Sequence, residues 1–367
     1  MRSRVLLVFG GDSSEHEISC LTAGGVLRAL DRTRFDVSCV GIAKGGRWVL
    51  VDEAVVAGYR IVDGVLPTVD ASLADAVMFR SAEGAQLARV AGDRLTDRVT
   101  VDVAFALLHG PFGEDGTIQG MFEMMGVRYV GAGVLSSAVC QDKVAMKQQF
   151  EAHGLTTGPY VVVRDADWTT DPTACLSRVT ALSSPWFVKP SRGGSSVGIS
   201  RVVDAADLAA AIEEARRHDP QVIVEQGLTD VHEVECAVVG SIDGPPVASL
   251  PGEVVVHTDT KFYDFETKYL PDQPLTLDIP ARLPSDVIER VRSVAVEAFT
   301  ALGAEGLARV DTFVQADGTV VLNELNTMPG FTATSMYPKM WEATGLDYTA
   351  LVSRLLDLAL ARPLGLR

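Results

Sequence analysis

Asp311 and Glu324 lie in two neighbouring apolar segments near the end of the chain, where together they could bind a divalent cation. Residues 307–314 and 319–326 are each typical of a β-strand, and Asp317-Gly318 between them is a strong signal for a tight hairpin turn. A two-residue turn places Asp311 directly opposite Glu324, where two carboxylates repel each other. A cation between them would remove that repulsion, so the pair predicts a metal site.

The same register pairs Phe313 with Leu322 and Arg309 with Asn326. Because side chains alternate along a strand, residues 309, 311, 324 and 326 should share one face. Such all-oxygen ligands suit Mg²⁺, and Arg309 beside the metal could stabilise developing negative charge. A four-residue loop would still leave these four side chains on one face, whereas a three-residue loop would not. The other interpretation is a surface strand with solvated acids. The interleaved apolar residues argue against it: Val310, Val314, Val321 and Leu325.

A glycine-rich segment, Lys189-Pro-Ser-Arg-Gly-Gly-Ser-Ser-Val-Gly198, follows an apolar run and could cover a phosphate. Small residues let backbone N–H groups approach an anion closely, and hydroxyl groups add donors. The segment lacks the Gly-Lys-Ser/Thr ending of a P-loop, and a flexible surface loop is the alternative. The chain holds 25 Arg and only 7 Lys, so a lysine is expected to mark a site that needs a compact positive charge.

Weaker signals occur elsewhere. Two glycine-containing turns resemble dinucleotide-binding turns but lack the third glycine: Gly10-Gly11 and Gly131-x-Gly133. Glu15, in the first turn of the helix that follows, could serve only as a favourable charge at the helix N-terminus. His109 follows a buried apolar run and is placed for a ligand crevice or for a structural hydrogen bond. Residues 261–269 combine four aromatics with two lysines, which is typical of a lid, although a solvated charged loop is the alternative.

The elements that position these residues alternate between strand and helix, which predicts an α/β protein. Residues 52–98 and 252–275 receive no regular structure, the latter being a long polar loop. We expect strands at 5–9, 35–42, 101–108, 186–189, 199–203, 221–225, 234–242, 247–250, 307–314 and 319–326, and helices at about 14–30, 136–153, 204–218, 285–302 and 347–361.

Composition excludes several classes of protein. The 367 residues carry a formal charge of −16, which disfavours nucleic acid as a partner, and no apolar run could span a bilayer. The apolar run Val5–Phe9 is too short for a signal peptide, and five scattered cysteines argue against disulfides and zinc. We therefore expect a cytoplasmic protein without a membrane partner. The chain contains no Ser-His-Asp order and no HExxH motif, so acyl-enzyme hydrolysis and zinc catalysis lack support.

Taken together, a metal site, a phosphate-covering loop, isolated lysines and a lid predict an ATP site without a P-loop. ATP would suit the activation of a carboxylate, whose oxygen becomes a leaving group once it is phosphorylated.

Five segments in order resemble the D-alanine–D-alanine ligase family of the ATP-grasp superfamily. They are GGDSSEHEIS (10–19), HGPFGEDGTIQG (109–120), KPSRGGSSVG (189–198), FYDFETKY (262–269) and ARVDTFV…LNELNTMPGFT (308–332). The resemblance implies an ATP-grasp fold, α/β with an α+β C-terminal part, preceded by a Rossmann-like domain. It implies a Rossmann-like domain at 1–131, a central ATP-grasp subdomain at 132–225 and a C-terminal subdomain at 226–367.

The resemblance also implies the ligation of two D-alanines with ATP and two Mg²⁺ or Mn²⁺ ions, in peptidoglycan synthesis, by a homodimer. It implies catalytic roles for Glu15, Ser195, Tyr269, Arg309 and the Gly330 backbone, substrate contacts at His109, Ser335 and Met336, and metal ligands at Asp311, Glu324 and Asn326. The residues it assigns to ATP are Lys143, Lys189, Ser196, Glu225, Gln226, Leu228, Glu233, Tyr263 and Lys268.

Three other functions remain as alternatives. A depsipeptide ligase would take D-lactate as its second substrate, but such relatives tend to alter the Lys-Tyr pair that is intact here as Lys268-Tyr269. An NAD-linked oxidoreductase is weakened by the missing third glycine. A non-catalytic ATP-binding module would have no use for a complete set of Arg309, Asp311, Glu324 and Asn326.

Overall fold

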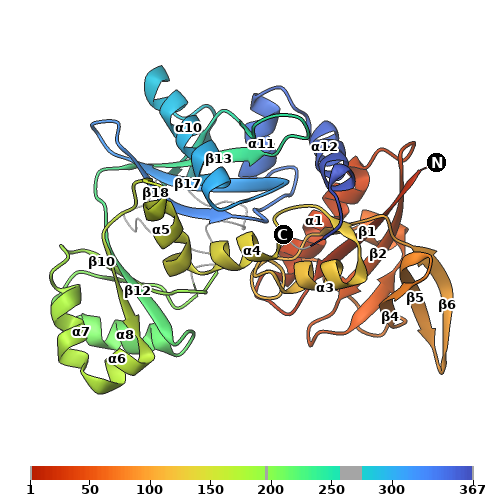
Figure 1. The fold of residues 1–367 in the computed structure, drawn as a ribbon, viewed down its shortest axis with the longest axis horizontal. Helices are drawn as coiled ribbons and strands as arrows, with labels where there is room; N and C mark the ends of the chain where they lie inside the picture. Colours follow the sequence, from red (N-terminus) through yellow and green to blue (C-terminus); the bar gives the residue numbers. More distant parts are fainter. Residues whose placement is uncertain (1, 195–196, 257–274, 366–367) are drawn as a thin grey trace.

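The computed structural model describes residues 2–194, 197–256 and 275–365, which form three groups of elements that follow one another along the chain (Figure 1). It has the mixed α/β architecture that the sequence predicts. No helix in these residues is long and apolar enough to cross a membrane.

The first group is a five-stranded sheet in the order β3-β2-β1-β7-β8, parallel except at β3. Its strands are buried along most of their length, as expected for a parallel sheet covered by helices. The elements are β1 (Ser3–Gly10), α1 (His16–Ala29), β2 (Phe35–Ile42), β3 (Trp48–Val51), α2 (Glu53–Ala57), β7 (Val103–Ala106), α3 (Thr117–Met125) and β8 (Arg128–Tyr129). The predicted strands at 5–9 and 35–42 are confirmed, and that at 101–108 is shorter.

Residues 76–100, left without structure in the sequence-based prediction, form a three-stranded antiparallel sheet of β4 (Ala76–Ser81), β5 (Gly84–Ala91) and β6 (Arg94–Thr100). Only a few positions, such as Ala85 and Leu87, are buried, and β6 is exposed along most of its length. The strands therefore carry little hydrophobic alternation, which is why the pattern was missed.

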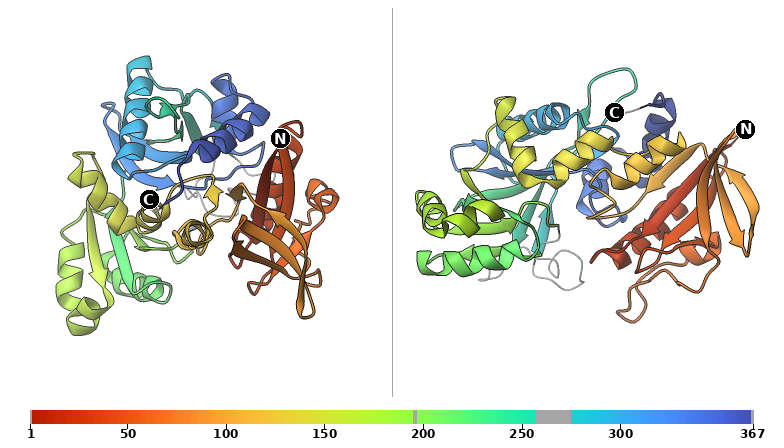
Figure 2. Two further views of the ribbon diagram at one scale, coloured as in Figure 1. Left: turned by 45° about the vertical axis from the view of Figure 1, so that its right-hand side comes forward. Right: turned by 60° about the horizontal axis from the view of Figure 1, so that its bottom comes forward.

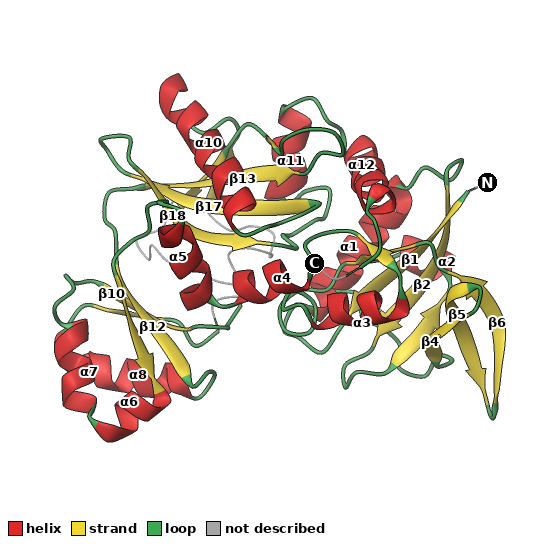
Figure 3. Ribbon diagram, viewed as in Figure 1, coloured by secondary structure: helices red, strands yellow, loops and turns green. Residues whose placement is uncertain are grey.

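The second group is an antiparallel sheet in the order β11-β10-β12-β9, with helices packed on it (Figure 3). Its elements are β9 (Tyr160–Arg164), α6 (Asp165–Thr170), α7 (Pro172–Val179), β10 (Trp186–Pro190), β11 (Ser200–Val202), the 3₁₀ turn η1 (Ala205–Asp207), α8 (Leu208–Arg216) and β12 (Gln221–Gln226). The predicted strands and the predicted helix in this region are confirmed with small changes of boundary.

The single helix predicted over 136–153 is wrong, because Asp142 divides it into α4 (Val134–Gln141) and α5 (Lys143–Ala152). Asp142 has an extended backbone, and its side chain caps α5 by accepting the N–H groups of Val144 and Ala145 at 3.0 and 3.1 Å. The break places Lys143 in the first turn of α5.

The third group is an antiparallel sheet in the order β16-β15-β13-β17-β18, with β14 also paired to β13. Its elements are β13 (His232–Val239), β14 (Val247–Ala248), β15 (Gly252–Val256), β16 (Leu275–Asp278), α10 (Ser285–Ala301), β17 (Leu307–Val314), β18 (Val320–Asn326), α11 (Met336–Ala343) and α12 (Tyr348–Ala361). The prediction of a loop over 252–275 is wrong at both ends, because β15 and β16 pair with each other. Helix α11 was not predicted.

In the hairpin of β17 and β18, Asp311 and Glu324 are paired as predicted, but the turn is longer than predicted and the register changes within the hairpin. Gln315 and Thr319 close a three-residue turn, which shifts the register by one so that Phe313 faces Val321 rather than Leu322. An extra residue in β18 between Leu322 and Glu324 then shifts the register back. Asp311 therefore does face Glu324, and Arg309 faces Asn326.

The two faces of this sheet are divided between two cores. Helix α10 covers the face that carries Cys236, Val238 and Val310, whereas Ala237, Val239 and Leu307 on the opposite face pack toward α11 and α12. By alternation, the side chains of 235, 309 and 311 lie on the face away from α10. Helix α12 also packs against β7, β8 and α1 of the first group, and Figure 2 shows the blue C-terminal helices beside the red segments.

Candidate active site

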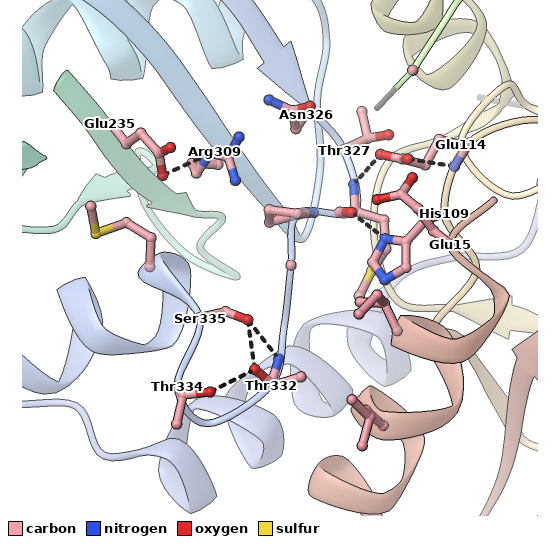
Figure 4. Close-up of a pocket in the computed structure, with 18 of the residues that line it drawn as sticks. Glu15, His109, Glu114, Glu235, Arg309, Asn326, Thr327, Thr332, Thr334 and Ser335 are labelled. Carbon is pink, nitrogen blue, oxygen red and sulfur yellow. Dashed lines mark hydrogen bonds and ion pairs between the residues drawn. The ribbon is translucent and has the colours of Figure 1, made fainter. Parts of the chain in front are cut away.

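A cavity of about 620 Å³ lies between the first group of elements and the third, and Gly193, Gly194 and Ile199 of the second group also line it (Figure 4). The loops that follow β1 and β7, the junction of α4 with α5, the ends of β17 and β18 and the segment 327–336 all contribute to its wall. Nine residues predicted from the sequence line it: Glu15, His109, Lys143, Arg309, Glu324, Asn326, Gly330, Ser335 and Met336. The structure thus brings together residues that are more than 300 positions apart.

Three carboxylates lie side by side across the third sheet, because Glu235 pairs with Asp311 and Asp311 pairs with Glu324. Arg309 partly neutralises them. Its Nε and Nη2 atoms lie 2.7 and 2.6 Å from the two oxygens of Asp311, and Nε lies 3.1 Å from Glu235. Asn326 Nδ2 donates to Asp311 at 3.0 Å. Asp311 does not itself line the cavity, but its partners Arg309 and Asn326 do.

The donor atoms of this cluster fit a hard cation. Among the described residues no three histidine, cysteine, aspartate or glutamate side chains converge as a metal site. Asp311 and Glu324 with the amide of Asn326 nevertheless form an oxygen-only set at one edge of the cavity. Such a set suits Mg²⁺, which keeps several waters and takes further oxygens from phosphate groups.

Glu15 lies at the start of α1 and is 8% exposed. The chain reaches it through Gly10 and Gly11, which have φ values of +90° and +94°. A Cβ atom on Gly10 would lie 2.3 Å from the carbonyl oxygen of Ile42, so this approach requires glycine. The turn delivers Glu15 to the cavity beside His109 (Figure 4).

His109 is 3% exposed and is tied to the far side of the cavity. Its Nδ1 atom lies 3.1 Å from the carbonyl oxygen of Met328, which can only accept, so Nδ1 carries the proton. The other ring nitrogen, Nε2, has no hydrogen-bond partner among the residues that the structure describes. Glu114, five residues further on, accepts the N–H of the same Met328 at 3.2 Å.

A buried ionic cluster lies outside the cavity wall. Glu225 on β12 pairs with Lys147 at 2.8 Å and also with Lys189 on β10. Burial alone would raise the pKa of Glu225, but the two ammonium groups outweigh it and hold that pKa well below its usual range. Burial lowers the pKa of Lys189, yet Glu225 outweighs burial and the net shift is upward, with Glu324 and Glu233 adding to it. Lys189 therefore stays charged.

Of the other described residues predicted to bind nucleotide, Lys143 lines the cavity, whereas Gln226, Leu228 and Glu233 do not. Lys143 Nζ donates to the carbonyl oxygen of Gly193 at 2.6 Å. Gln226 Oε1 accepts the N–H of Ser183 at 3.0 Å, and Leu228 follows β12. Five predicted residues lie outside the described part of the chain: Ser195, Ser196, Tyr263, Lys268 and Tyr269.

Three residues of the site were missed by sequence reasoning. Lys147 follows Lys143 by four positions, a spacing that places both on one side of a helix. Glu235 alternates with Glu233 on a strand, and it pairs with Asp311 only through a contact that the sequence does not reveal. Glu114 stands in the segment that was noted for His109 alone.

Comparison with known proteins gives a consistent result. Two family models match, described as D-ala D-ala ligase N-terminus over residues 4–132 and D-ala D-ala ligase C-terminus over 149–357. The D-alanine--D-alanine ligase of Kineococcus radiotolerans is 50% identical, covering 100% of this chain and 99% of that protein. The D-alanine--D-alanine ligase of Mycobacterium sp. strain KMS is 49% identical, with coverages of 100% and 98%.

Solved structures are similar over nearly the whole chain. The VanG D-Ala:D-Ser ligase from Enterococcus faecalis has a TM-score of 0.82 at 32% identity, with 98% of this chain and 100% of that chain covered. The D-alanine-D-alanine ligase from Coxiella burnetii has a TM-score of 0.81 at 32% identity, with coverages of 98% and 94%.

Proposed function

Because the chain belongs to the D-alanine–D-alanine ligase family, which has the ATP-grasp fold, we propose that it joins two D-alanines into D-alanyl-D-alanine, for peptidoglycan synthesis, at the expense of ATP. The reaction is ATP + 2 D-alanine → D-alanyl-D-alanine + ADP + phosphate. The observation that carries the proposal is the pairing of Arg309 with Asp311 and Glu235 at the edge of a cavity that also holds Glu15.

In the first step a carboxylate oxygen of one D-alanine attacks the γ-phosphorus of ATP, which forms an acyl phosphate and releases ADP. In the second step the neutral amine of the other D-alanine attacks the acyl carbon, and phosphate leaves with the bonding electrons. Glu15 holds the ammonium group of the first D-alanine, with Ser195 and Tyr269 assigned to the same contact. Arg309 and the Gly330 N–H stabilise the oxyanion that forms on the acyl carbon.

The roles proposed for the remaining residues follow from the matching positions in the family's motifs. His109 contacts the first D-alanine, Ser335 receives the carboxylate of the second, and Met336 lies beside it. Asp311, Glu324 and Asn326 would hold two Mg²⁺ or Mn²⁺ ions, which would supply positive charge to neutralise the transferring phosphoryl group. Carboxylate and amide oxygens on one sheet face support this role.

The nucleotide would be gripped between the second and third groups of elements. Lys143, Lys189 and Lys268 neutralise its phosphates, Ser196 donates to them, and Tyr263 lies nearby. Glu225, Gln226 and Leu228 form the hinge that contacts adenine, and Glu233 binds the ribose. The charged state of buried Lys189 supports a role in phosphate binding.

We also propose a division into domains at 1–131, 132–225 and 226–367, a homodimer and a cytoplasmic location. The five cysteines are all free and buried, which supports a reducing compartment.

Phosphate release measured with ATP and Mg²⁺, with and without D-alanine, tests the function. We expect release that depends on D-alanine and a product with the mass of the dipeptide. A competition between D-alanine and either D-lactate or D-serine shows which second substrate the protein prefers. A predominant depsipeptide product would favour the alternative ligase. ATP binding without turnover would indicate a non-catalytic module and contradict the proposal.

A further inference from the structure

One carboxylate at the cavity, Glu114, is not needed to bind either D-alanine or ATP in the scheme above. Its two oxygens accept two backbone N–H groups that belong to different parts of the chain. Oε2 accepts from Gly110 at 2.7 Å, within its own loop. Oε1 accepts from Met328 at 3.2 Å, a residue 214 positions away. Glu114 therefore links the loop after β7 to the segment after β18 (Figure 4).

Met328 is held on both of its backbone polar groups by this loop. Its N–H donates to Glu114, and its carbonyl oxygen accepts from His109 Nδ1 at 3.1 Å. Met328 is 7% exposed, so its peptide groups have little access to water that could replace these partners. The two contacts thus fix the two peptide units on either side of the Met328 Cα atom, that with Thr327 and that with Pro329.

Gly330 follows Met328 by two residues, so its N–H lies within about 7 Å of the anchored peptide along the chain. Pro329 between them has a ring-locked φ, which leaves few ways for the intervening backbone to turn. On the other side of Gly330, Phe331 is fully buried, and its carbonyl oxygen accepts from the Tyr348 hydroxyl at 2.7 Å. Gly330 thus lies between two backbone segments, at Met328 and at Phe331, that hydrogen bonds hold in place.

We propose that Glu114 is a positioning residue for the ligation, which acts through Met328 to aim the Gly330 N–H at the oxyanion. The inference rests on the proposed function, because it assigns Glu114 a part in the step for which Gly330 is the donor. A purely local role would need only the Gly110 contact. The contact with Met328 instead crosses the cavity to the segment that carries the donor.

The contacts of Glu114 with both N–H groups depend on its charge. An ionised carboxylate accepts a hydrogen bond at each oxygen, whereas in a carboxylic acid one oxygen carries a proton and accepts less readily. Desolvation by burial raises the pKa of Glu114 to about 7, against the opposing effects of His109 and the N–H of Gly110. The titratable groups that face it are His109 from its own loop, Glu15 from α1 and Cys140 from α4. As the pH falls through about 7, protonation should loosen the hold on Met328.

Rates of phosphate release for Glu114→Gln test the inference. We expect kcat to fall by about 10- to 100-fold, below the ~10²–10³-fold loss of an oxyanion donor itself. The KM for ATP should stay within about twofold, because the proposed nucleotide residues lie elsewhere. The acid limb of the kcat profile near pH 7 in the unchanged protein should disappear in the variant.

Asp115→Asn is the matched control. Among the residues that the structure describes, this neighbouring carboxylate accepts from the N–H groups of Phe112 and Thr117 alone, both close to it in sequence, at 2.8 and 3.0 Å. It should keep the kcat and the acid limb even if the loop loses stability. A purely structural role for Glu114 would make the two variants alike.

Wild-type kcat and an unchanged acid limb in Glu114→Gln would overturn the inference. If that variant does not fold, Glu114→Asp takes its place, because it keeps the charge but is too short to span both N–H groups. Full kcat in Glu114→Asp would likewise overturn the inference, and a reduced kcat at constant ATP KM would support it. Failure of the proposed function is distinguishable, since the unchanged protein would then release no phosphate on addition of D-alanine.

Discussion

Arg309 and Asp311 stand two residues apart on β17 and are joined by two hydrogen bonds, from Nε and Nη2 to the two oxygens of the carboxylate. Alternation along the strand puts them on one face, where Arg309 also reaches Glu235. A cation that binds Asp311 must therefore share this carboxylate with Arg309. The guanidinium and the metal ions would be positioned by the same acidic residues.

Replacing Arg309 by Lys should impair the chemical step more than binding. An ammonium group keeps the charge but cannot donate in parallel to Asp311 while contacting Glu235. We expect kcat to fall by about 100-fold with little change in the KM for ATP, as for the loss of an oxyanion donor. Initial rates at saturating D-alanine measure this. Arg292→Lys on α10, outside the cavity wall, is the control, and equal effects in both variants would contradict the prediction.

Glu324→Ala should abolish turnover while leaving the fold intact, because it removes a proposed metal ligand rather than a core side chain. Phosphate release and thermal unfolding measure the two effects. Glu297→Ala on the outer side of α10 should change neither, since its partner there is the exposed Ser293. Normal phosphate release by Glu324→Ala would remove Glu324 from the metal site.

Lys147→Met should destabilise the protein. Lys147 is 3% exposed, and its loss leaves buried Glu225 with one ammonium partner instead of two. Breaking a buried ion pair costs about 3–5 kcal/mol, and retained Lys189 should reduce that figure. Urea unfolding compared with Glu225→Gln and the double variant gives the coupling energy. Additive effects would show that Lys147 and Glu225 do not interact.

Acid should destabilise the protein partly through Glu225. Its pKa in the folded protein lies below the unfolded value, so the unfolded chain takes up the proton first as the pH falls. The contribution is therefore complete above the unfolded pKa and is lost as the pH falls through the folded one. Glu225→Gln should have a flatter dependence of unfolding free energy on pH below about 4.5 than the unchanged protein. Parallel curves would contradict this.

Glu114 should contribute to stability in the opposite direction. Its folded-state pKa of about 7 lies above the ordinary value of 4.5 for a glutamate, so the folded protein binds the proton more tightly. Stability from this group is present at low pH and is lost as the pH rises from 4.5 to about 7, by at most about 3 kcal/mol. The difference in unfolding free energy between the unchanged protein and Glu114→Gln should shrink between pH 5 and pH 8. A constant difference would show that Glu114 keeps an ordinary pKa.

The register of the β17–β18 hairpin shows how far sequence reasoning reached. A two-residue turn predicts that Asp311 pairs with Glu324. The structure has this pair, but with a three-residue turn and a compensating bulge. Leu322 and Leu325 are three positions apart yet both lie in the core under α10, which the bulge makes possible and which the apolar pattern of the sequence alone does not reveal. The pairing was right because two single-residue shifts cancel.

Other parts of the site could not be predicted because they depend on contacts between distant segments. The motif around His109 was recognised, yet nothing in the sequence links Glu114 to Met328. Lys147 is helical and polar by pattern, and only the approach of β12 makes it a buried partner of Glu225. The break at Asp142 was hidden because apolar periodicity continues on both sides of it.

Helices α11 and α12 complete the hydrophobic core that β1, β2 and β7 begin. Ribosomal synthesis delivers those strands first and Leu351, Leu355 and Leu356 only after more than 200 further residues. Helices α1 and α2 already pack on β1 and β2, so a nascent chain halted before α12 would lack only the part of this core that covers β7 and β8, and those apolar strands would be open to chaperones or to aggregation. Completion of the first core therefore depends on the last helix of the chain.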